Sequence, residues 1–152
     1  MKRIIYLFLG IIASFLVGCN DKEELGFTWS SAPLTIRLEI VDGENKNLLD
    51  AEMEGNIRDN AIKAYYKGNV YPVNDITKVT YKGGFYMDET YLYCGYLRNE
   101  AGSNVVIDWD NGRKDTIEFR YVDTRGWVFF LNGNEAEAKD SKYPNRITVV
   151  MK

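Results

Sequence analysis

The stretch NVVIDWDNGRKDTIEFRYV, residues 104–122, decides the fold class of this chain. Apolar and polar residues alternate on both sides of Asp110-Asn111-Gly112, which is the period of a half-buried β-strand. The three central residues are typical of a tight turn. We therefore expect a β-hairpin with a three-residue loop, formed by a type I turn with Gly112 left-handed in a G1 bulge.

The length of the loop determines which side chains share a face of this hairpin. A two-residue Asn111-Gly112 loop would mix the apolar residues with Lys114 and Glu118, whereas a three-residue loop pairs Val105 with Ile117. The longer loop is the better prediction, because it gathers the large apolar residues on one face. The outward face then carries Val106, Asp108, Thr116, Glu118 and Arg120.

The same period of two recurs along the rest of the chain. Leu34, Ile36, Leu38 and Ile40 alternate with polar residues, which predicts another half-buried strand. Eight or nine short strands separated by turn residues are typical of an antiparallel β-sandwich, with an up-and-down barrel as the alternative. The expected strands are 34–40, 62–66, 70–74, 76–81, 90–97, 104–109, 116–122, 127–131 and 146–151.

Local signals add detail to this layout. Gly68-Asn69 is suited to a type II′ hairpin turn. Pro72 lacks a backbone donor, which places its strand at a sheet edge or a bulge. Helical signals are few, with about two turns expected at 47–54 and one at 135–139.

Composition excludes several classes of function. The chain has 152 residues, 19 Lys and Arg against 22 Asp and Glu, and a net charge of −3. A general nucleic-acid-binding surface would be clearly basic, so no nucleic-acid partner is expected. His is absent, so the chain alone can build no Ser-His-Asp triad, Cys-His dyad or His-ligated metal site. No cofactor is expected.

The N-terminus has the pattern of a secretory signal. Met1-Lys2-Arg3 is positive, and residues 4–17 are apolar apart from small or weakly polar residues. This apolar run of about 14 residues is shorter than the roughly 20 that a simple transmembrane helix needs. Its length therefore favours a cleaved signal over a retained anchor.

Directly after the apolar run, Leu16-Val17-Gly18-Cys19 resembles the lipobox of bacterial lipoproteins. In that family a diacylglyceryl group is attached to the Cys thiol, the signal is cut just before that Cys, and the new amino terminus is usually acylated. The resemblance implies lipid attachment at Cys19, with fatty acyl chains such as palmitate that hold the protein firmly on a bilayer. The implied layout is a signal peptide at 1–18, a lipidated Cys and tether at 19–33, and one β-sandwich domain at 34–152. A plain secretory signal followed by an incidental Cys is the alternative.

The residues after Cys19 bear on localisation. Lys22-Glu23-Glu24 resembles the surface-export signal of Bacteroidota-type lipoproteins, in which a Lys and two acidic residues follow the lipidated Cys closely. The resemblance implies an outer-membrane lipoprotein displayed at the cell surface. The periplasmic face of the outer membrane is the alternative.

Three internal stretches resemble small Bacteroidota lipoproteins. They are Asp42-Gly43 with Asn47-Leu48-Leu49-Asp50, Val106-Ile107-Asp108-Trp109-Asp110-Asn111-Gly112 continuing to Asp115-Thr116-Ile117, and Leu131-Asn132-Gly133-Asn134-Glu135. Together with the lipobox they span most of the chain, and none of them is an active-site motif. The resemblance implies a cell-envelope β-sandwich and little about its ligand.

The acidic residues around the central turn do not have the spacing of a calcium site. The oxygen-bearing residues there are Asp108, Asp110, Asn111, Asp115 and Glu118. An EF-hand loop begun at Asp108 would place Gly112 at position 5, where a ligand is needed. The hairpin explains these residues better, and no metal site is predicted.

Cys94 lies within an expected strand and is predicted to be a small buried hydrophobic residue. Lipidation would use the sulfur of Cys19, so no disulfide is expected between the two. No residue is predicted to be catalytic.

Aromatic residues are the remaining candidates for binding, because Tyr and Trp bring large area and one polar tip to an interface. In alternating strands about half of them face the core, so none is assigned to a ligand-binding site. The candidates are Trp29, Tyr65, Tyr66, Tyr71, Tyr86, Tyr91, Tyr93 and Trp127.

Three functional hypotheses follow. The first is a lipid-anchored, non-catalytic binding or interaction module of the outer membrane, with a glycan or another envelope protein as ligand. The second is a structural subunit of a surface assembly that takes a neighbour's strand at a sheet edge, which Pro72 would discourage on one side. The third is a small hydrolase that uses two carboxylates, as glycoside hydrolases do.

Overall fold

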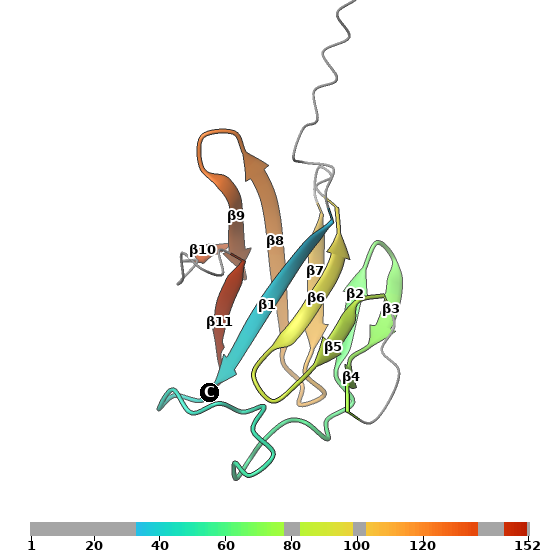
Figure 1. Cartoon of the computed structure of the whole chain (residues 1–152), viewed down its shortest axis with the longest axis vertical. Coiled ribbons are helices and arrows are strands. Elements are labelled where there is room, and N and C mark those ends of the chain that lie inside the picture. Colours follow the sequence, from blue (N-terminus) through green and yellow to red (C-terminus); the bar gives the residue numbers. More distant parts are fainter. Residues whose placement is uncertain (1–32, 78–82, 99–102, 137–144, 152) are drawn as a thin grey trace, which may run out of the picture.

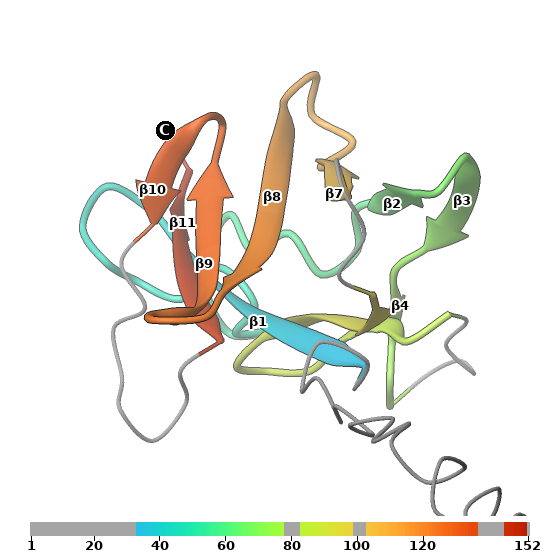
Figure 2. The same ribbon diagram turned by 90° about the horizontal axis from the view of Figure 1, so that it is seen from above.

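The protein is a sandwich of two β-sheets in its computed structural model, which describes residues 33–77, 83–98, 103–136 and 145–151. Figure 1 shows the two layers face on, and Figure 2 shows them from above. The first sheet has the strand order β11-β1-β6-β5-β4, and the second has the order β10-β9-β8-β7-β2-β3. The strands are β1 (Leu34–Val41), β2 (Lys63–Tyr66), β3 (Asn69–Pro72), β4 (Asn74–Asp75), β5 (Phe85–Met87), β6 (Leu92–Leu97), β7 (Asn104–Asp108), β8 (Lys114–Val122), β9 (Gly126–Leu131), β10 (Asn134–Ala136) and β11 (Arg146–Val150).

The predicted all-β sandwich is confirmed, because the described strands form two separate sheets rather than one closed sheet. Eleven strands are described where eight or nine were expected. The predicted signal peptide, the lipobox Leu16-Val17-Gly18, the lipidated Cys19, the export signal, the tether up to residue 32 and Trp29 lie outside the described residues.

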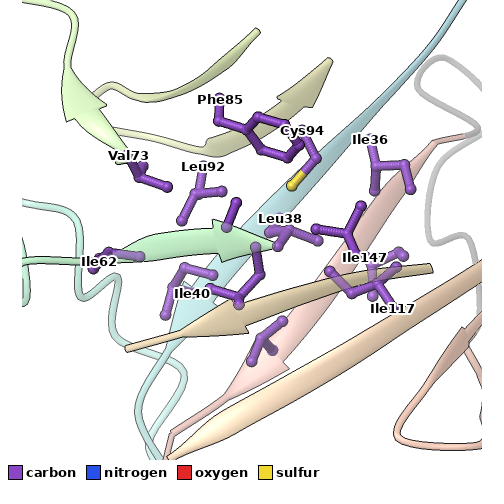
Figure 3. Close-up of a cluster of buried hydrophobic side chains, with 14 of the residues drawn as sticks. Ile36, Leu38, Ile40, Ile62, Val73, Phe85, Leu92, Cys94, Ile117 and Ile147 are labelled. Carbon is purple, nitrogen blue, oxygen red and sulfur yellow. The ribbon is translucent and has the colours of Figure 1, made fainter. Parts of the chain in front are cut away.

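The core forms where the alternating strands face each other. Leu34, Ile36, Leu38 and Ile40 of β1 are each 3% exposed or less, and the polar residues between them are half-buried on the other face. Burying one such aliphatic side chain contributes about 1.5–3 kcal/mol. Figure 3 shows side chains from both sheets meeting in this cluster, among them Ile117 of β8.

The β7–β8 hairpin has the predicted register. Val105 pairs with Ile117, and the backbone of Trp109 donates to the carbonyl of Arg113 at 3.2 Å, which closes the three-residue loop. Gly112 is left-handed with φ of 85°, as expected. The predicted type I turn is wrong at its first position, because Asp110 has φ of 60° where that turn needs a negative φ.

Two strand pairs correct the prediction of an all-antiparallel sandwich. β11 runs parallel to β1, and the two-residue β4 runs parallel to β5. The chain leaves the second sheet at β10 and enters the first at β11, in the same direction as β1. No tight turn joins β11 to β1, so the residues near β11 give no sequence signal that predicts its direction.

The β2–β3 hairpin corrects a predicted turn and confirms a predicted edge. Tyr66 pairs with Asn69, so the loop is Lys67-Gly68 rather than Gly68-Asn69. Both loop residues have positive φ, at 50° and 74°, which is a type I′ rather than a type II′ turn. β3 is an edge strand, and Pro72 ends it, as its missing donor predicted.

Some expected elements are replaced by others. The strand predicted at 76–81 is wrong at Ile76 and Thr77, which lie in a turn. Its remaining residues, 78–81, lie outside the described residues. The short strands β4, β5 and β10 were not predicted as such. With two or three residues each, they are too short to show alternation.

The helix predicted at 47–54 is wrong, because polar side chains there bind the backbone locally. Asn47 accepts from the N–H of Leu49, and Asp50 accepts from the N–H of Glu52, both at 2.9 Å. Such bonds compete with helical hydrogen bonds. Leu48 also donates its N–H to the carbonyl of Ile40 at 2.9 Å, which ties the segment to β1.

The helical turn predicted at 135–139 is also wrong over its described part. Residues 135 and 136 belong to β10, which pairs with β9 across the Asn132-Gly133 turn. Residues 137–139 lie outside the described ranges. Both turn residues have positive φ, which favours a tight β-hairpin over the start of a helix.

Candidate functional site

A hollow of about 460 Å³ lies on the outer face of the second sheet. Ligand pockets commonly range from about 300 to 1,000 Å³. We call it the β8 hollow, since β8 crosses its centre. Its lining residues are Ser103, Asn104, Glu118, Phe119, Arg120, Phe130 and Gly133.

Strand register brings the lining residues together from three neighbouring strands. Asn104 of β7 lies directly opposite Glu118 of β8, and Glu118 lies opposite Phe130 of β9. Because cross-strand partners share a face, these three side chains form a row across the sheet. Arg120 stands two residues along β8 from Glu118 and therefore projects from the same face.

An aromatic ring and a guanidinium meet in the hollow. The guanidinium carbon of Arg120 lies 4.8 Å from the centroid of the Phe130 ring, within the range of a cation–π contact. Arg120 is exposed and Phe130 is half-buried. The ring is therefore covered by a long side chain that can move aside without disturbing the core.

The polar side chains of the hollow have few partners within the described part of the chain. No hydrogen bond or ion pair joins Ser103, Asn104 or Glu118 through its side chain to another described residue, and Arg120 contacts the Phe130 ring alone. A hydroxyl, an amide, a carboxylate and a guanidinium thus line the same hollow as one aromatic ring. Such a set can hydrogen-bond a polar ligand while the ring packs on an apolar face of that ligand.

A second aromatic cluster lies on the outer face of the first sheet. It differs from the β8 hollow because its rings and polar groups contact one another. The rings of Tyr86 and Tyr93 stack with centroids 4.4 Å apart and planes 11° apart. The guanidinium carbon of Arg37 lies 6.0 Å from the Tyr93 ring on the neighbouring strand, and Tyr91 meets Tyr93 edge-on at 6.0 Å. We call these four residues the tyrosine ladder.

Polar groups of the ladder are also paired. The hydroxyl of Tyr93 donates to Asp88 at 2.9 Å, and burial together with this hydrogen bond raises the pKa of Tyr93 to about 12. Arg146, which lies 5.9 Å from the Tyr91 ring, also pairs with Glu39 at 3.1 Å. These contacts explain the ladder as cross-strand stabilisation of the sheet.

The other aromatic candidates among the described residues belong neither to the lining of the β8 hollow nor to the tyrosine ladder. Tyr66 is buried, and its hydroxyl accepts from the N–H of Arg98 at 2.9 Å. Tyr71 stacks on Phe85 of the core with centroids 5.0 Å apart. Of the two remaining residues, Tyr65 makes a cation–π contact with Lys114. The half-buried Trp127 contacts the rings of Tyr121 and Phe119.

The acidic residues around the β7–β8 turn are used within the fold. Asp108 pairs with Lys114 at 3.0 Å, and the hydrogen bond from Lys114 lowers the pKa of Asp108. Asp110 accepts from the N–H of Ala61 at 3.0 Å, and Asn111 accepts from that of Arg113 at 3.0 Å. These residues do not converge on one point, and the described residues contain no group of three or more acidic or Cys side chains placed to hold a metal ion.

Cys94 is fully buried in the core, as predicted. Burial raises the pKa of its thiol, which disfavours the reactive thiolate. Figure 3 shows its sulfur inside the core cluster, near Phe85, Leu92 and Leu38. Cys94 therefore acts as a core residue.

A buried ion pair joins the long β1–β2 connection to β4. The guanidinium of Arg58 donates through both Nε and Nη2 to Oδ2 of Asp75, and both side chains are less than 10% exposed. Burial opposes ionisation of Asp75, but hydrogen bonds from Thr77 and Arg58 outweigh it and hold its pKa at about 2. The pair stabilises a connection that has no regular structure of its own.

The sequence predicted no ligand-binding residue and did not identify the β8 hollow, although it predicted the face on which two of the lining residues lie. It placed Glu118 and Arg120 outward, which the structure confirms. It missed Phe130 because the segment Trp127-Val128-Phe129-Phe130-Leu131 is apolar throughout and shows no alternation. The pairing of Phe130 with Glu118 is the signal that identifies its face.

No helix among the described residues combines the length and hydrophobicity needed to cross a membrane. Comparisons of the chain with protein-family models, with curated proteins and with solved structures found no match. Function is therefore inferred from the residues themselves.

Proposed function

We propose that this protein is a lipid-anchored, non-catalytic binding module of the outer membrane, and that it binds a glycan in the β8 hollow. The observation that supports the proposal is the shared lining of the hollow by the Phe130 ring, the Arg120 guanidinium and three polar side chains, those of Ser103, Asn104 and Glu118, which hydrogen-bond no other side chain or backbone group within the described residues. The tyrosine ladder carries no such proposal, because its rings and polar groups already contact one another.

Sugars suit this arrangement because they combine an apolar C–H face with many hydroxyls. The C–H face would pack on Phe130 in place of the Arg120 side chain. Glu118 and Asn104 would then accept and donate hydrogen bonds to hydroxyls, and the freed guanidinium would donate to further oxygens. The hollow lies on an open sheet face, so binding of moderate affinity is expected rather than complete enclosure.

A binding role fits the hollow better than catalysis. Glycoside hydrolysis needs two carboxyl groups, roughly 5 Å apart in retaining enzymes and about 6.5–9.5 Å apart in inverting ones. Glu118 is the one carboxylate in the described lining of the hollow. A hydrolase would need a second acidic side chain beside it.

The proposed location comes from the N-terminal motifs. Acyl chains on Cys19 would hold the module on the outer membrane, and Lys22-Glu23-Glu24 would direct it to the cell surface. Two or more acyl chains anchor far more firmly than one. Labelling of the full-length protein with a radioactive fatty acid, lost in a Cys19→Ser variant, tests the anchor separately from the binding site.

The binding proposal is tested by screening the full-length protein, purified in detergent, on a glycan array and measuring affinity for each glycan that binds. Phe130→Ala should weaken binding by roughly tenfold or more, because one stacking contact contributes on the order of 1–2 kcal/mol. Glu118→Gln should weaken it through a lost charged acceptor. Tyr86→Ala, in the tyrosine ladder, is the matched aromatic control and should leave the affinity unchanged. Binding that survives Phe130→Ala but fails in Tyr86→Ala would move the site to the first sheet.

A further inference from the structure

We propose that the outer edge of β11, on the side away from β1, takes one extended peptide segment as an added strand, with apolar peptide side chains entering the groove between β11 and the β9–β10 hairpin. This inference does not depend on glycan binding, since the groove and the β8 hollow have no lining residue in common. It makes the edge-pairing hypothesis specific to one strand.

The first step is the direction of the β11 backbone groups. The N–H of Arg37 donates to the carbonyl of Asn145 at 2.8 Å, and the N–H of Met151 donates to the carbonyl of Val41 at 2.7 Å. In a parallel ladder alternate residues bond to the same neighbour. Odd-numbered residues of β11 therefore bond to β1, and the N–H and C=O groups of Thr148 and Val150 point away from the sheet.

The second step is a groove beside that edge. It has a volume of about 430 Å³. Its walls come from β11, from the β9–β10 hairpin and from the loop after β1. The lining residues are Asn45, Leu131, Asn132, Asn134, Glu135, Ala136, Ile147, Thr148 and Val150.

The lining of the groove matches the alternation of an extended chain. Leu131, Ala136 and Ile147 give it an apolar base, whereas the Asn and Glu side chains lie around them. A strand that bonds to β11 would send every second side chain toward this base. Val150, at the end of β11, is 41% exposed and extends the apolar surface along the edge.

The other sheet edges are less suited to strand addition. β3 turns Val70 and Pro72 outward, because Asn69 and Tyr71 bond to β2, and Pro72 has no N–H to offer. β10 has three residues and turns Glu135 alone outward, and β4 has two residues. β11 is thus the edge with the longest run of available backbone groups within the described strands.

A single peptide fits this edge better than a second copy of the chain. The β9–β10 hairpin stands beside β11 and forms the opposite wall of the groove. A second copy that paired through its own β11 would bring its own hairpin into the same place. Arg113 also reaches the edge, where its Nη1 donates to the carbonyl of Val150 at 2.7 Å, and so it would limit pairing at that end.

Amide hydrogen exchange of the full-length protein tests whether the edge is free. The amides of Thr148 and Val150 should exchange much faster than those of Ile147 and Val149, their neighbours in the same strand, which bond to β1. Equal protection of all four would overturn the proposal, because the edge would then already be covered.

Peptide selection tests the occupant. A library of random phage-displayed peptides of about 10 residues should yield binders with apolar residues at alternate positions. Bound peptide should protect the amides of Thr148 and Val150. Thr148→Pro removes an outward N–H and should weaken binding by about tenfold, whereas Val70→Pro, the same change on the β3 edge, should have no effect.

A further variant distinguishes a loss of peptide binding from misfolding of β11. Ala136→Phe fills the groove without altering the β11 backbone, and it should also weaken binding. Selected peptides that bind both Thr148→Pro and Ala136→Phe as tightly as the natural protein would overturn the proposal. So would a library without binders, or a protein that forms dimers with Thr148 protected in the absence of peptide.

Discussion

The carboxylate of Asp115 accepts a hydrogen bond from the indole of Trp109, with 2.7 Å between Oδ2 and Nε1, and both residues are 1% exposed or less. Arg113 donates to the same carboxylate at 2.9 Å, and Asn132 donates to it at 2.7 Å. The loop after β7 and the turn after β9 thus meet at one buried charge. A buried carboxylate is tolerated only where donors satisfy it, as they do here.

Replacement of Asp115 by Ala should destabilise the protein by about 1–3 kcal/mol, because it leaves the fully buried Trp109 N–H without its acceptor, whereas the Arg113 side chain is 31% exposed and can reach water. Urea unfolding followed by Trp fluorescence measures the change. Asp108→Asn in the same hairpin is the control, and it should have little effect because the Asp108–Lys114 pair lies at the surface. Similar losses in both variants would contradict the special role of the buried site.

The Arg58–Asp75 pair predicts a pH-dependent contribution to stability. Asp75 has its pKa lowered to about 2 in the folded protein, from 3.8. A carboxyl whose pKa is lowered by folding stabilises the protein above the unfolded pKa and loses that contribution as the pH falls through the folded pKa. Asp75→Asn should therefore cost about 3 kcal/mol at pH 7.

The difference in unfolding free energy between the natural protein and Asp75→Asn should shrink as the pH is lowered from 3.8 toward 2. Urea unfolding at a series of pH values measures it. Asp50→Asn, in an exposed position of the same connection, supplies the comparison. A difference that stays constant down to pH 2 would show that the Asp75 charge does not stabilise the fold.

Gly84 is predicted to tolerate no side chain. Its φ is +77°, and a Cβ there would lie 2.5 Å from Cδ2 of the Tyr96 ring and 3.0 Å from the carbonyl carbon of Gly95. Gly84→Ala should cost about 2 kcal/mol, from left-handed strain of about 1–2 kcal/mol and displacement of the ring. Gly43→Ala, with negative φ and nothing within 4 Å of its Cβ, is the control.

A variant of Tyr96 separates the two causes of this loss of stability, which are the backbone strain at Gly84 and the contact with the Tyr96 ring. Tyr96 is 65% exposed, so Tyr96→Ala removes the contact with the ring without opening the core, whereas the approach to the Gly95 carbonyl carbon remains. The double variant Gly84→Ala, Tyr96→Ala should lose less stability than the sum of the two single variants, and thermal unfolding of all three gives the coupling. Strict additivity would assign the whole cost to the backbone.

The sequence predicted those parts of the fold that depend on local alternation. Leu34 to Ile40 and the hairpin at 104–122 alternate cleanly, so their buried and exposed faces could be assigned from the residues alone. The helix predicted at 47–54 failed because propensity did not account for Asn and Asp side chains that bind the backbone. The parallel pairing of β1 with β11 joins segments far apart in the chain, and neither carries a local signal for it.

In the candidate site, too, the residues of alternating strands could be predicted and the others could not. Glu118 and Arg120 could be placed on the outer face because β8 alternates, whereas Phe130 lies in a uniformly apolar strand whose two faces look alike. The tyrosines at 86, 91 and 93 could be proposed for binding from composition, but composition does not show that they stack on one another. Partners of side chains come from register, and register needs the whole sheet.

The Tyr93 hydroxyl provides a last prediction, at alkaline pH. Burial and the hydrogen bond to Asp88 raise its pKa to about 12 in the folded protein, from 10.0. A group whose pKa is raised by folding contributes stability that is complete below the unfolded pKa and is lost as the pH rises through the folded pKa. The natural protein should therefore be more stable than Tyr93→Phe by a constant margin below pH 10, and this margin should shrink between pH 10 and 12. Unfolding at a series of alkaline pH values measures the margin, and Tyr96→Phe, whose ring is exposed, is the control. A margin that is independent of pH would show that the hydroxyl is not held in its neutral form by the fold.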